Sequence, residues 1–131
     1  YEARTGKLVV VPGFTKHPTL AWCGGSVDGL VDDEGIIEIK CPATSTHIET
    51  LLAGAIPEEH APQTQGYLWI TGRAWCDFTS YDPRLPEHLQ LFVCRVQRDD
   101  AYIAKLAAAV EVFLGEVDAM LVKLATYKQA A

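Results

Sequence analysis

The central segment of the predicted fold is Gly25-Ser26-Val27-Asp28-Gly29-Leu30-Val31-Asp32-Asp33-Glu34-Gly35-Ile36-Ile37-Glu38-Ile39-Lys40. Residues 32–35 have the composition of a turn, and apolar, β-branched residues lie on both sides of them. This pattern predicts a β-hairpin, with one strand over residues 20–31 and the next over residues 36–40. Pairing of the two strands would bring together carboxylates that lie on different arms of the hairpin.

Asp28, Glu38 and Lys40 could form a hydrolytic site on this hairpin. Two close carboxylates repel each other unless a cation lies between them, and oxygen ligands suit Mg²⁺, or Mn²⁺, better than zinc. Because strand side chains alternate between faces, Lys40 is expected on the same face as Glu38. A lysine beside such a metal could orient the attacking water or offset charge that develops on a phosphate. The pattern therefore favours phosphodiester hydrolysis.

The same three residues also fit a hairpin on the protein surface. In that interpretation the aspartate belongs to a turn, and the glutamate and lysine form a solvated pair. The isoleucines on both sides of Glu38 instead favour a buried strand. A buried charge needs a partner or a metal, so they shift the balance toward a functional site.

The rest of the chain alternates between strand-like and helix-like segments. Strands are expected over residues 8–11, 75–81 and 89–96, a loop over 82–86, and helices over 46–55, 61–71 and from about 99 onward. Thr46 and Glu49 have the spacing of a capping box for the first helix. The order of elements predicts a single α/β domain over residues 1–131, with a central mixed β-sheet flanked by helices and a long C-terminal helix.

Composition restricts the class of protein. A chain of 131 residues with 49% hydrophobic and 21% charged residues has the size and character of one globular domain. No apolar run approaches the roughly 20 residues that cross a bilayer. The net charge of −6 is unusual for a DNA-binding protein, although carboxylates that hold cations would contribute to it. The four cysteines form no C-x-x-C pair, which is typical of free thiols in an intracellular protein.

Several motifs in combination make the sequence similar to a known family. They are Gly25-Ser26-Val27-Asp28-Gly29-Leu30, Glu38-Ile39-Lys40-Cys41-Pro42, Gln63-Thr64-Gln65-Gly66-Tyr67, Trp69, Trp75 and Tyr81-Asp82-Pro83-Arg84. The sequence resembles the lambda-exonuclease-like (YqaJ-like) viral recombinase family of the PD-(D/E)XK nuclease superfamily. The resemblance extends over nearly the whole chain and implies a restriction-endonuclease-like core.

The resemblance also implies a role for each of five residues. Asp28 and Glu38 match the family's metal carboxylates, and the carbonyl of Ile39 matches its backbone metal ligand. Lys40 matches the catalytic lysine. Gln63 matches the glutamine that the family keeps beside the active site on the following helix. The expected catalytic set is therefore Asp28, Glu38, Lys40 and Gln63.

Two positions depart from the family pattern. Val27 replaces the proline that gives the superfamily its name, a harmless change because that residue only precedes the acid. The family's further glutamate, on a helix before the first strand, has no match here, because Glu2 lies too close to Gly6 and the first strand. We therefore expect the sequence to lack an N-terminal helical segment that carries this glutamate and basic residues for DNA.

The resemblance implies a Mg²⁺-dependent exodeoxyribonuclease that digests duplex DNA ends in phage-type recombination. Its expected partners are a single-strand annealing protein and further copies of itself in a homotrimer, in the cytoplasm of a bacterial host, with no membrane association. One alternative is a catalytically incomplete DNA-binding or assembly module with the same fold. Another is a repair or CRISPR-type nuclease of the superfamily with an iron–sulfur cluster.

Other polar residues are weaker candidates for the site. His47 and His60 lie beside predicted helix starts, where capping or solvent exposure is expected. The tryptophans are expected in the core rather than stacked on bases. Arg84 is an exposed loop cation that could contact a DNA phosphate.

Overall fold

The computed structural model describes residues 1–127, and the chain divides into two compact units, residues 1–99 and the segment that begins at Asp100. The first unit holds α1 (Glu2–Thr5), β1 (Val9–Val10), β2 (Phe14–Lys16), β3 (Gly24–Ser26), β4 (Gly29–Val31), β5 (Gly35–Lys40), α2 (Thr44–Ala53), η1 (Glu58–His60), α3 (Ala61–Thr71), β6 (Trp75–Tyr81), η2 (Glu87–Leu89) and β7 (Leu91–Gln97). The second unit holds α4 (Asp100–Ala125).

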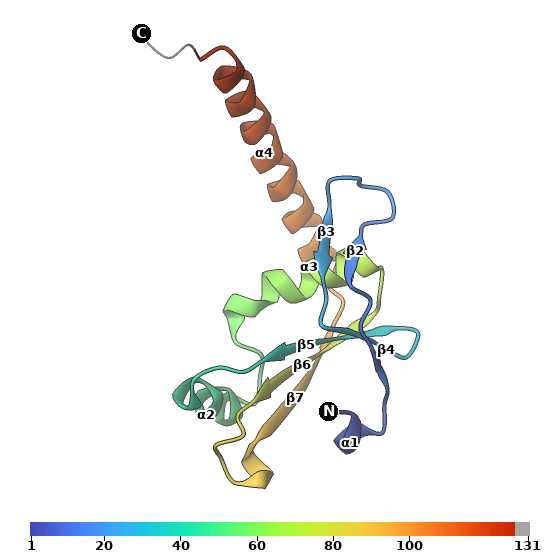
Figure 1. Ribbon diagram of the computed structural model, residues 1–131, viewed down its shortest axis with the longest axis vertical. Coiled ribbons are helices and arrows are strands. Elements are labelled where there is room, and N and C mark those ends of the chain that lie inside the picture. The colour runs from blue at the N-terminus through green and yellow to red at the C-terminus, as the bar shows by residue number, and fades with distance from the viewer. Residues whose placement is uncertain (128–131) are drawn as a thin grey trace. The chain divides into compact units, whose positions relative to one another are not determined.

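A five-stranded mixed sheet forms the centre of the first unit, in the order β1-β4-β5-β6-β7. Strands β5 and β6 are parallel, and the other neighbouring pairs are antiparallel. Because parallel strands need a long crossover, the chain passes from β5 to β6 through α2, η1 and α3. The predicted β4–β5 hairpin is present, and the mixed α/β sheet confirms the predicted fold class (Figure 1).

One face of the sheet packs against α3. The register pairs Glu38 with Phe78, so these two side chains share this face. A fully buried cluster holds the helix against the sheet and consists of Val27, Ile36, Leu68 and Cys76. Figure 1 shows α3 on this side of the sheet and α1 on the other. The site residues of β5 therefore project toward α3.

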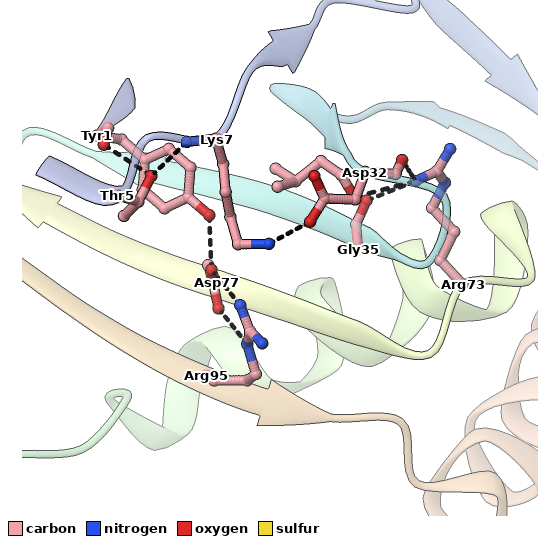
Figure 2. A network of polar contacts seen from close by, with 9 residues as sticks. Tyr1, Thr5, Lys7, Asp32, Gly35, Arg73, Asp77 and Arg95 are labelled. Atoms are coloured by element: carbon pink, nitrogen blue, oxygen red, sulfur yellow. Dashed lines mark hydrogen bonds and ion pairs between the residues drawn. The ribbon is translucent and has the colours of Figure 1, made fainter. Parts of the chain in front are cut away.

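The opposite face carries a polar network that Figure 2 shows from close by. The carboxylate of Asp77, which is only 3% exposed, accepts two hydrogen bonds from Arg95, at 2.7 and 2.8 Å, and one from the Tyr1 hydroxyl at 2.6 Å. The guanidinium of Arg95 also lies over the Trp75 ring, 3.6 Å from its centroid. This network connects the start of the chain to β6 and β7.

Two local predictions were wrong. The strand expected over residues 20–31 is divided into β3 and β4, and β3 pairs with β2 in a separate two-stranded sheet. Asp28 lies at the break, between the two strands. The expected capping box is absent, because α2 begins at Thr44 after Ala43, which makes no side-chain cap. Thr46 is thus already inside the helix.

Helix α4 runs from Asp100 to Ala125, as the spacing of its apolar residues predicts. Several of these residues are exposed, among them Phe113 and Leu124. Within residues 1–127, none of the helices has the length and apolar character that a membrane span requires.

Candidate active site on strand β5

Asp28 is positioned by a hydrogen bond to the strand that carries the other site residues. Its Oδ2 accepts a bond of 2.7 Å from the main-chain amide of Ile39. The side chain of Asp28 is exposed, so a ligand can reach it. The break between β3 and β4 therefore places this carboxylate beside β5.

Glu38 is the buried member of the site, with 3% of its surface exposed. Its Oε1 accepts a hydrogen bond of 2.6 Å from Nζ of Lys40. Within the described part of the chain, its buried Oε2 has no hydrogen-bond partner. Burial raises the pKa of Glu38 above its ordinary value, and the negative charge of Asp28 raises it further, against the opposing effect of Lys40. The two carboxylates are therefore close enough to repel each other.

Lys40 connects Glu38 to helix α3. Its Nζ also donates a hydrogen bond of 2.8 Å to Oε1 of Gln63. The alternation of side chains along β5 predicts that Glu38 and Lys40 lie on the same face of the strand, and their hydrogen bond shows that they do. The resemblance placed Gln63 beside the site, and the structure also has that contact.

The carboxylates of Asp28 and Glu38 fit a divalent cation, because one buried oxygen of Glu38 lacks a hydrogen-bond partner within the described residues. An unpaired buried carboxylate oxygen is costly, and a cation bound by Asp28 and Glu38 would satisfy it and remove their repulsion. Within residues 1–127, no group of three or more His, Cys, Asp or Glu side chains could hold a metal. The site thus offers two carboxylates, and the family resemblance adds the main-chain carbonyl of Ile39 as an expected third ligand. Mg²⁺ commonly keeps several waters, so a set of this size is compatible with it.

Glu2 is not part of this site. It belongs to α1, and its Oε1 accepts a hydrogen bond of 2.7 Å from the amide of Val9. This bond supports the start of β1. The position agrees with the expectation that Glu2 does not replace the family's further glutamate.

Neither histidine that the sequence assigned to helix caps or solvent caps a helix with its side chain, although His60 does occupy the N-cap position of α3. His47 is fully buried, with ring nitrogens 2.7 Å from the Ser80 hydroxyl and 2.8 Å from the Leu89 carbonyl. His60 is half-buried and stacks on Phe78. Burial lowers the pKa of His60, and the nearby charge of Lys40 lowers it further. Sequence reasoning missed that His60 lies near the site, because its contacts join segments far apart in the chain.

The remaining candidates are divided between core and surface. Trp75 is buried, as expected, whereas Trp22 is 49% exposed. Arg84 is an exposed loop cation, but its guanidinium donates to the Asp82 carboxylate at 2.7 Å and to the Pro42 carbonyl at 3.1 Å. The cysteines of the described chain are free thiols.

The family is established by comparison with known proteins. The model of the YqaJ-like viral recombinase domain matches residues 1–74. The chain belongs to this family. An alkaline exonuclease (LHK-Exo) from Laribacter hongkongensis is similar to this YqaJ-like chain, with 49% identity and a TM-score of 0.91, over 95% of this chain and 64% of that one. The same exonuclease in complex with dAMP matches equally well.

More distant comparisons add only the fold. A phage related exonuclease from Haemophilus somnus 129PT has 16% identity and a TM-score of 0.68, over 94% of this chain and 66% of that one. No curated protein matches. The YqaJ-like chain spans 64% of the length of the alkaline exonuclease, slightly less than two thirds.

Proposed function

We propose that this chain is the catalytic core of a Mg²⁺-dependent exodeoxyribonuclease that hydrolyses phosphodiester bonds at the ends of duplex DNA. The observation that carries the proposal is Glu38, a buried carboxylate that is bound to Lys40 and repelled by Asp28, with one oxygen unpartnered within the described chain. Such an arrangement is costly for a protein that uses it only for stability. Membership of the YqaJ-like family supports the same function.

Each site residue has a distinct part in the proposed hydrolysis. Asp28, Glu38 and the Ile39 carbonyl would hold the cation, which supplies Lewis-acid polarisation of the phosphate and a lower pKa for water. Lys40 is held by Glu38 and Gln63, so its ammonium is already oriented before DNA binds. From there it can align the attacking water or stabilise negative charge on the phosphate oxygens as the bond breaks.

The expected DNA partner has support from a relative. The alkaline exonuclease has been solved in complex with dAMP, a deoxynucleotide. By analogy with that exonuclease, the substrate here would be DNA, and the finer proposal is a duplex end. We further propose that the protein forms a homotrimer and works with a single-strand annealing protein. Its proposed location is the cytoplasm of a bacterial host.

A second candidate function is a DNA-binding or assembly module that retains the fold without hydrolysis. The observation that favours it is the size of the acidic set, because residues 1–127 hold no group of three or more metal-binding side chains. Its Asp28 and Glu38 would then bind a cation weakly and without turnover. The two candidates predict different outcomes on the same substrate.

Digestion of DNA by the full-length protein separates these candidates. Linear duplex DNA is incubated with Mg²⁺, Ca²⁺ or EDTA, with covalently closed circular DNA as the control for internal cleavage. We expect nucleotide release from the linear DNA in Mg²⁺ alone, its loss in Glu38→Gln and its retention in Glu34→Gln, an exposed turn residue of the same hairpin. DNA binding without nucleotide release would establish the second candidate, and digestion in EDTA would contradict the metal dependence.

A further inference from the structure

The amide of Gln63 is held from two sides. Its Oε1 accepts the hydrogen bond from Lys40, and its Nε2 donates to the Tyr67 hydroxyl over 3.4 Å. The two residues of α3 lie four positions apart, so their side chains are neighbours on one face of the helix. An ammonium can only donate, so the oxygen of the amide must face Lys40 and its nitrogen must face Tyr67.

The ring of Tyr67 is fixed by its packing. It is half-buried and packs against the core cluster of Val27, Ile36, Leu68 and Cys76. It also lies directly over Gly25 of β3, where an added Cβ would be 2.6 Å from Cε1 of the ring. A side chain at position 25 would therefore displace the tyrosine. Gly25 lies shortly before Asp28, so Tyr67 contacts both the segment that leads to the exposed carboxylate and the glutamine that binds the lysine.

We propose that Tyr67 is a positioning residue of the active site, whose hydroxyl fixes the Gln63 amide so that its oxygen faces Lys40. The proposal rests on the proposed function, because Lys40 is the group whose alignment matters. Without the hydroxyl, the amide of Gln63 keeps Lys40 and the neighbouring Glu38 carboxylate but loses the partner that Tyr67 offers its nitrogen, so rotation about its last bond is less restricted. Lys40 then has a less fixed acceptor and spends more time away from its reactive position.

The bond at 3.4 Å is long, so its removal should have a small and specific effect. Tyr67→Phe keeps the ring on Gly25 and removes only the hydroxyl. We expect the single-turnover rate of DNA cleavage to fall roughly three- to tenfold, with DNA affinity unchanged. Tyr81→Phe, at the end of β6, is the matched control and should retain the wild-type rate.

A double-mutant cycle with Gln63→Ala distinguishes positioning from packing. If Tyr67 acts through Gln63, Tyr67→Phe has no further effect on the rate once Gln63 is alanine. An equal loss in both backgrounds would overturn the proposal, because the hydroxyl would then act independently of the glutamine.

A measurement on the free protein keeps the proposal testable if the chain proves inactive. Side-chain ¹⁵N relaxation reports the order of the Gln63 amide group. We expect this order to fall in Tyr67→Phe and to stay the same in Tyr81→Phe. An unchanged Gln63 amide in Tyr67→Phe would overturn the proposal. If the amide loosens in Tyr67→Phe but the wild-type protein does not cleave DNA, only the proposed function is contradicted.

Discussion

The main-chain amide of Ile39 donates a hydrogen bond to Oδ2 of Asp28 over 2.7 Å. This bond connects the break between β3 and β4 to the strand that carries Glu38 and Lys40. It brings an exposed carboxylate to a buried one, and the charge of the first raises the pKa of the second. The connection therefore creates an electrostatic cost that a bound cation would relieve.

Glu38→Gln should separate stability from metal binding. Removing the buried charge and its repulsion by Asp28 should raise the free energy of unfolding without metal by about 1 kcal/mol. Wild type should also gain thermal stability with added Mg²⁺, whereas the variant should not. Denaturant unfolding and thermal melts with and without Mg²⁺ measure both effects, and Glu34→Gln serves as the control. A variant stabilised by Mg²⁺ as much as wild type would exclude Glu38 from the metal site.

Asp77→Asn should weaken the dependence of stability on acidic pH. Burial alone would raise the pKa of Asp77, but hydrogen bonds from Arg95 and Tyr1 lower it overall. A lowered pKa in the folded state stabilises the protein above the unfolded value of about 3.9, and this contribution is lost as the pH falls through the folded value.

Urea unfolding at about pH 6 and about pH 3 measures this contribution. Near pH 6 the Asp77→Asn variant should be less stable than wild type by about 1–3 kcal/mol, because Arg95 loses a charged acceptor. The difference between the two proteins should narrow near pH 3. A difference that is the same at both pH values would show that the charge of Asp77 contributes nothing.

Gly35→Ala should destabilise the sheet. The Trp75 ring lies against the glycine, and an added Cβ would be 2.1 Å from its Cη2. We expect a loss of about 1–3 kcal/mol, since overpacking moves a buried ring away from Arg95. The matched control is Gly115→Ala in α4, where an added Cβ meets nothing within 4 Å and should stabilise the helix by up to about 1 kcal/mol. Gly35→Ala with wild-type stability in urea would contradict the close packing.

Local sequence signals predict much of this fold. The turn chemistry before Gly35 predicts the β4–β5 hairpin, and the alternation of β5 predicts that Glu38 and Lys40 share a face. The sequence did not predict that the strand before Asp28 is divided. Apolar residues continue across the break, but β3 and β4 pair with different strands. Val27 joins the main core, whereas β3 pairs with β2 in another sheet.

Contacts between distant segments explain the other failures. Thr46 and Glu49 have the spacing of a capping box, but His47 between them is buried and its ring nitrogens form hydrogen bonds with Ser80 and Leu89. No local pattern contains that information. The contact of Gln63 with Lys40 is equally non-local, and it was expected only from resemblance to the family.

The role of Lys40 is tested by the cleavage rate of Lys40→Ala in the full-length protein, measured in a single turnover with saturating protein on linear duplex DNA. Lys7→Ala is the matched control, since Lys7 pairs with Asp32 and lies over Trp75, away from the site. If Lys40 acts on the phosphate in the transition state, the cleavage rate of Lys40→Ala falls by about two or more orders of magnitude below that of wild type, while its DNA affinity changes little. A Lys40→Ala rate within a few-fold of wild type would contradict the claim that Asp28, Glu38 and Lys40 form the hydrolytic centre.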